Sequence, residues 1–80
     1  MHELGVLYHI AKKVYQITIE NGITKVKHIA LEVGDASGFV PRYLTKLFSI
    51  AADAYPVLKD TELRISIVRG KGLVIKEIGY

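Results

Sequence analysis

The sequence predicts a small two-layer α+β domain, in which two helices pack on one face of a three-stranded mixed sheet in the order αβαββ. Apolar residues recur at helical spacing in two segments, and they alternate with polar residues in three others. The helical segments are 4–20 and 39–55, and the strand segments are 25–33, 61–68 and 73–78. Eighty residues suit one domain, so residues 1–80 are predicted to form a single unit.

The first helical segment carries an apolar stripe on one side and polar residues on the other. The stripe consists of Leu4, Leu7, Ala11, Val14 and Thr18, and the polar side of His9, Lys12, Lys13, Gln16 and Glu20. Asn21 and Gly22 follow, and both tolerate the left-handed backbone conformation that ends many helices. The segment therefore predicts an amphipathic helix that ends near residue 20.

Residues 25–33 change from helical spacing to alternation, which predicts the first strand. Alternation places Ile29, Leu31 and Val33 on one face of the sheet and Val26, His28, Ala30 and Glu32 on the other. The sequence GDASG at 34–38 predicts a loop, after which helical spacing resumes. Pro41 should lie in the first turn of this second helix, because its missing N–H removes no helical hydrogen bond there.

The last two strand segments are separated only by RGKG at 69–72. Leu63, Ile65 and Ile67 should share one face of the earlier strand. Glycines 70 and 72 permit a tight turn, which predicts an antiparallel hairpin. The first two strands flank a helix, so they should be parallel and joined by a right-handed crossover.

Composition excludes several classes of function. The chain has no cysteine, and so no disulfide, zinc ribbon or thiol nucleophile. Its first ten residues lack the apolar run of a signal peptide, and no stretch reaches the roughly 20 apolar residues of a membrane span. We therefore expect a cytoplasmic protein without membrane association. The formal charge is +3, but the basic residues are spread along the chain, which disfavours nucleic-acid binding.

No catalytic pattern stands out. The serines lack a nucleophile-elbow setting, no carboxylate pair is placed for acid–base work, and GDASG lacks the spacing of a phosphate-binding loop. We expect a protein that is not an enzyme and has no catalytic residue.

The chain begins Met-His-Glu, which places an imidazole one residue from a free α-amine. The Met1 amine, the His2 amide nitrogen and His2 Nδ1 lie on consecutive chelate rings and can offer three nitrogens in one plane. Nickel(II) and copper(II) favour this arrangement, whereas zinc favours a tetrahedron. Glu3 adds a carboxylate for a further position. The alternative is a disordered chain end without a ligand role.

Larger parts of the sequence resemble the HypA/HybF family of nickel-insertion accessory proteins for hydrogenase and urease. The resemblance rests on Met-His-Glu at the start, on Leu31-Glu32-Val33-Gly34, on Ser37-Gly38-Phe39-Val40-Pro41, and on the closing segment LVIKEI at 73–78. The family normally inserts a zinc ribbon with two CxxC pairs between its last two strands. This chain has RGKG there, so the ribbon is absent and a hairpin at about 69–72 takes its place.

The resemblance implies a nickel metallochaperone domain that binds Ni(II) through its amino terminus. It implies His2 as the principal ligand, beside the Met1 amine, with Glu3 in support and Asp35 as a secondary candidate. It also implies a maturation GTPase and a nickel-enzyme precursor as partners, and no zinc is expected without cysteine. The rival interpretation is a protein-interaction module, such as a homodimer, that kept the fold and lost the metal chemistry, since a three-stranded sheet has exposed edges.

Overall fold

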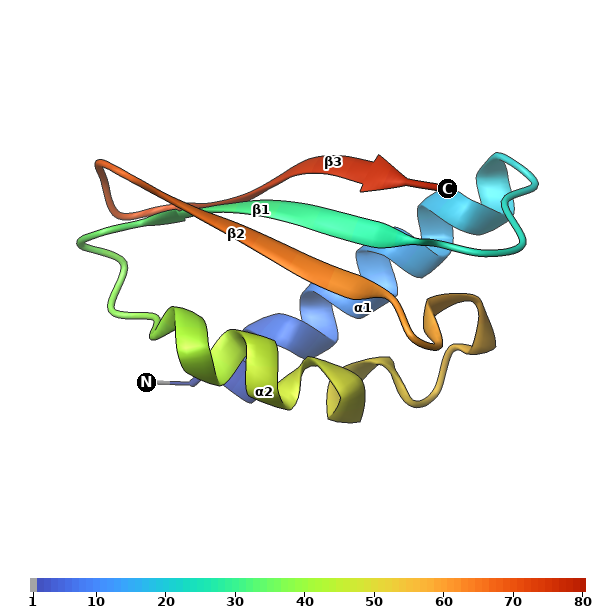
Figure 1. Ribbon diagram of the computed structural model, residues 1–80, viewed down its shortest axis with the longest axis horizontal. Coiled ribbons are helices and arrows are strands. Elements are labelled where there is room, and N and C mark those ends of the chain that lie inside the picture. The colour runs from blue at the N-terminus through green and yellow to red at the C-terminus, as the bar shows by residue number, and fades with distance from the viewer. Residues whose placement is uncertain (1) are drawn as a thin grey trace.

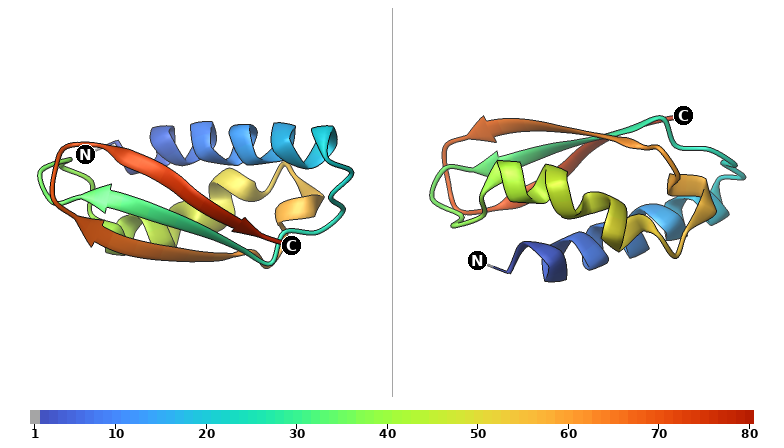
Figure 2. Two further views of the ribbon diagram at one scale, coloured as in Figure 1. Left: turned by 90° about the horizontal axis from the view of Figure 1, so that it is seen from above. Right: turned by 60° about the horizontal axis from the view of Figure 1, so that its bottom comes forward.

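The computed structural model describes residues 2–80 as two helices beneath a three-stranded sheet (Figure 1). The elements are α1 (Glu3–Glu20), β1 (His28–Gly34), α2 (Pro41–Ala52), the short 3-10 helix η1 (Pro56–Leu58), β2 (Glu62–Val68) and β3 (Leu73–Gly79). Both helices lie on the same side of the sheet (Figure 2). The predicted α+β class, the order αβαββ and the two-layer arrangement are confirmed.

The sheet has the order β2-β1-β3, with β1 in the centre. β1 and β2 are parallel, as predicted, and β1 and β3 are antiparallel, with an irregularity in the pairing at Ala30/Leu31. The predicted hairpin between the last two strands is wrong, because β1 lies between them. The connection 69–72 instead passes over the end of β1, where Gly34 N–H donates to the Gly72 carbonyl at 2.7 Å.

The core lies between the sheet and the two helices. Its fully buried larger side chains are Leu7, Val14, Val26, Ile29, Leu31, Val33, Leu44 and Leu58. The alternation predicted for β1 is confirmed in the strand itself, since Ile29, Leu31 and Val33 are buried. Two predictions of facing need correction, at Val26 and at Ile67.

Val26 was expected on the outer face of the sheet but is fully buried, because it lies before the strand begins. Its N–H donates to the Val57 carbonyl at 3.0 Å, and its own carbonyl accepts from Thr61 Oγ1 at 2.8 Å. Ile67 was expected in the core but is 56% exposed. It lies near the end of an edge strand, where one side has no neighbouring strand.

The ends of the helices follow from local chemistry. α1 ends where predicted, with Asn21 Nδ2 donating to the Ile17 carbonyl at 2.9 Å and Gly22 at φ 64°. α2 starts at Pro41 and ends at Ala52, earlier than the expected residue 55, because the chain turns there into η1 at Pro56. Within residues 2–80, neither helix is both long and apolar enough to cross a membrane.

Candidate metal centre

The amino-terminal segment enters the fold at the start of α1. Met1 lies outside the described residues, so the predicted amine ligand is not placed by the structure. His2 is exposed and is the residue that precedes the helix, and its carbonyl accepts from Val6 N–H at 3.3 Å. The N–H groups at a helix start have no partner within the helix. The His2 amide nitrogen is therefore not needed for the hydrogen bonds of α1.

Glu3 is buried, with only 4% of its surface exposed. Its Oε2 accepts a hydrogen bond from Val40 N–H at 2.9 Å, which ties the start of α1 to the residue before α2. This hydrogen bond lowers the pKa of the Glu3 carboxyl, and burial opposes it less strongly. Glu3 is thus an ionised, anchored group, a role that its place in a short motif did not reveal.

Asp35 lies in the loop after β1 and is exposed. Its Oδ1 accepts from Gly70 N–H at 3.1 Å, and its own N–H donates to the Val68 carbonyl at 2.7 Å. These contacts fasten the loop to the 69–72 connection. Among residues 2–80, no group of three or more histidine, cysteine, aspartate or glutamate side chains is placed to hold a metal ion.

The other two histidines differ in environment. His9 is exposed on α1, as its position on the polar side of the helix predicts. His28 Nε2 lies 2.8 Å from Glu77 Oε2, and this contact lowers the pKa of the Glu77 carboxyl. The His28 ring also covers Gly79, where an added Cβ would collide with it. Sequence reasoning missed this pair because it placed the last strand beside β2 and not beside β1.

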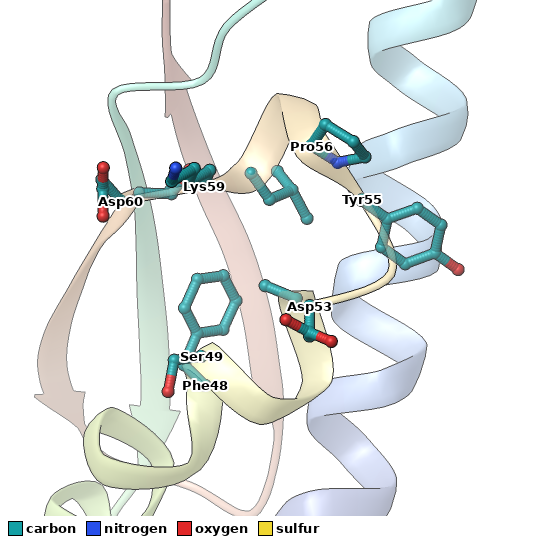
Figure 3. A pocket seen from close by; sticks show the side chains of 10 residues that line it. Phe48, Ser49, Asp53, Tyr55, Pro56, Lys59 and Asp60 are labelled. Carbon is teal, nitrogen blue, oxygen red and sulfur yellow. The ribbon is translucent and has the colours of Figure 1, made fainter.

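A cavity of about 480 Å³ lies at the other end of α2, bounded by η1 and the segment before β2 (Figure 3). Phe48, Ala52 and Leu58 give it apolar walls, and Asp53 and Lys59 also line it. Figure 3 shows the Tyr55 side chain turned toward α1, where it stacks on the Tyr15 ring with centroids 4.6 Å apart. No histidine of the described residues lines the cavity, and Figure 1 shows the segment after α2 at the opposite end of α1 from its first turn, so the cavity is not part of the candidate metal centre.

Comparison with known proteins gives consistent results. The family model for HypA, described as hydrogenase/urease nickel incorporation, metallochaperone, matches residues 1–77. The hydrogenase maturation factor HypA of Methanosarcina barkeri (strain Fusaro / DSM 804) is 34% identical over 68 residues, which is 85% of this chain. This chain spans about half of that relative, since the match covers 50% of it.

Solved structures agree on the fold. The solution structure of the nickel metallochaperone HypA from Helicobacter pylori superimposes with a TM-score of 0.78 at 17% identity, over 96% of this chain and 72% of that one. A second HypA solution structure gives 0.72 at 17% identity, over 96% and 71%. With the family model matched along nearly the whole sequence, this chain belongs to the HypA family of nickel metallochaperones.

Proposed function

We propose that this chain binds Ni(II) as cargo at its amino terminus and passes it on during maturation of a hydrogenase or urease. The observation that carries the proposal is the exposed His2 at the start of α1, directly before the anchored Glu3, in a member of a nickel-incorporation family. The proposed ligands are the Met1 amine, the His2 amide nitrogen and His2 Nδ1. This set of nitrogens suits the tetragonal preference of nickel(II).

The remaining predicted site residues have less direct support. Glu3 is next to this set and Asp35 is in the loop after β1, and both carboxylates already accept backbone hydrogen bonds. We therefore assign the main binding role to the Met1–His2 nitrogens, with a fourth position filled by water or by a partner protein. The proposed partners are a maturation GTPase and the precursor of the nickel enzyme.

The test is calorimetric titration of tag-free protein with nickel. Saturable binding near one equivalent, lost in His2→Ala and lost when the amino terminus is acetylated, is the expected result. His9→Ala is the matched control, because His9 is a second exposed histidine on α1 and should leave binding unchanged. Unchanged affinity after acetylation would refute the amine chelate.

A second candidate function, a protein-interaction module or homodimer, is favoured by the edges of the sheet. β2 and β3 each pair with β1 on one side only, so each has one unpaired edge. Such an edge can pair with a partner strand or with a second copy. Sedimentation at several concentrations, with and without nickel, separates the two: a dimer indifferent to nickel, together with no nickel binding, would support this candidate.

A further inference from the structure

The amino terminus of α2 has no capping side chain of its own. Its preceding residue is Val40, which cannot cap, and its first turn contains no acidic residue. Residues such as Ser, Thr, Asp or Asn are preferred at that position because a side-chain oxygen satisfies an otherwise unpaired N–H. At this helix start a side-chain oxygen comes instead from another helix and takes the N–H of Val40 itself, since Glu3 Oε2 accepts from Val40 N–H at 2.9 Å.

The Glu3 carboxylate therefore lies close to the starts of both helices. It belongs to the first turn of α1, and it is hydrogen-bonded to the residue before α2. The positive end of a helix dipole stabilises a negative charge, and the hydrogen bond between a backbone N–H and an ionised carboxylate is stronger than one between neutral groups. Moving Oε2 onto a metal ion would leave Val40 N–H without its partner in a partly buried place, which is unfavourable.

His2 is the next residue, and it is exposed. Fixing Glu3 fixes the backbone that follows the proposed chelate, while the His2 side chain remains free to bind. Holding a binding group in position beforehand raises affinity by reducing the entropy lost on binding. The contact between Glu3 and Val40 thus places the chelate at the surface without using the carboxylate as a ligand.

We propose that Glu3 is a positioning residue for the amino-terminal nickel site and not a ligand to it, acting through its hydrogen bond with Val40. This inference rests on the proposed function, because it concerns the same site. The Glu3 carboxylate could act as a metal ligand or as a positioning group, and the sequence motif alone does not separate these two roles.

The experiment compares Glu3→Gln with Glu3→Ala by nickel titration and by absorption of the bound nickel. Glutamine keeps the size and an oxygen that can accept from Val40 N–H, so its dissociation constant should stay within about threefold of the wild type. Glu3→Ala should weaken binding about tenfold or more, with the nickel absorption band unchanged because the ligands are the same. A Glu3→Gln variant that binds as poorly as Glu3→Ala, with a shifted band, would overturn the proposal.

A second variant separates the effect of Glu3→Ala on nickel binding from its effect on the stability of the fold. Val40→Ser added to Glu3→Ala gives α2 a capping side chain of its own. The double variant should regain thermal stability but not nickel affinity. Full recovery of affinity together with stability would show that Glu3 acts only by stabilising the fold, and the positioning role would be wrong.

Hydrogen exchange at Val40 N–H gives a readout independent of affinity. A positioning role predicts that this amide stays protected when nickel is added, whereas ligation through Oε2 predicts loss of protection. Ligation through Oε1 is detected by the shifted absorption band of the Glu3→Gln variant. If the wild type binds no nickel, the proposed function and this inference both fail. If the wild type binds but protection at Val40 is lost, only this inference fails.

Discussion

Replacing Gly34 by alanine should destabilise the fold, because a backbone segment lies where the new methyl group would be. An added Cβ would collide with the Gly70 oxygen, and it would lie 2.6 Å from the Gly70 carbonyl carbon and 3.0 Å from the Gly72 nitrogen. Real Cβ atoms do not approach that closely, so the 69–72 connection must move away from the end of β1. Forced insertion into a packed region costs about 1–3 kcal/mol.

The movement would also strain the hydrogen bonds that join the two segments. Gly34 N–H donates to the Gly72 carbonyl at 2.7 Å, and Ala36 N–H donates to the Gly70 carbonyl at 2.8 Å. Each such bond contributes about 0.5–1.5 kcal/mol. We expect a loss of about 2–4 kcal/mol in the free energy of unfolding, measured by urea denaturation followed by circular dichroism. The melting temperature should fall by about 8–30 °C, given about 4–8 °C per kcal/mol in a domain of this size.

Two matched glycine-to-alanine variants control for the substitution itself. Apart from the adjacent residues and the backbone of α1 around Gly5, no atom of residues 2–80 lies within 4 Å of a Cβ added at Gly5 or at Gly72, and neither glycine has a positive φ. Gly5 lies inside α1, so Gly5→Ala should stabilise the protein by up to about 1 kcal/mol. Gly72→Ala should be close to neutral. A Gly34→Ala variant within about 0.5 kcal/mol of the wild type would refute the close-approach argument.

Three further predictions concern the core, the open face of the sheet and the loop after β1. Leu44 is fully buried, so Leu44→Ala should lower the free energy of unfolding by about 2–5 kcal/mol in urea denaturation. The pKa of Glu77 is lowered by His28, so its stabilisation is present above the ordinary value of 4.5 and is lost as the pH falls below it. The melting temperature should therefore fall less steeply between pH 5 and about pH 3 for Glu77→Gln than for the wild type. Equal dependence of the melting temperature on pH in the two proteins would contradict this. Asp35→Asn keeps an oxygen for Gly70 N–H and should be near neutral, whereas Asp35→Ala should cost about 0.5–1.5 kcal/mol, and equal effects would exclude a role for that hydrogen bond.

Local patterns in the sequence predicted the helices and strands well, whereas the neighbour of the last strand was not predictable. The alternation of Leu73 to Ile78 is the same whether the strand pairs with β1 or with β2, and the short RGKG connection favoured the hairpin. In the structure that connection crosses to the far side of β1, and this brings His28 and Glu77 together across 49 residues. Contacts between distant segments decide such pairings, and periodicity carries no information about them.

The candidate site shows the same limit. The Met-His-Glu motif predicts candidate ligands, but it gives no sign that Glu3 is buried while its neighbour His2 is exposed. The difference arises from Val40, which lies 37 residues away and has an N–H that no nearby side chain satisfies. The chelate at Met-His-Glu therefore stays a prediction from the sequence, whereas the burial of Glu3 against Val40 could not be predicted from it.

The short 69–72 connection and the start of α1 lie at the same end of the molecule (Figures 1 and 2). Because this connection joins two strands on opposite sides of β1, a longer insertion there would leave the pairing of every strand intact. Crossing two strand spacings requires only about 10 Å, which four residues can span. The connection is hydrogen-bonded to Gly34 and Asp35, and the loop that these residues begin leads to Val40, which Glu3 holds. A continuous set of hydrogen bonds, two of them made by the Asp35 and Glu3 carboxylates, thus links the 69–72 connection to the start of α1. We therefore expect a change in length at 69–72 to alter the position of Val40 and, through Glu3, the proposed chelate.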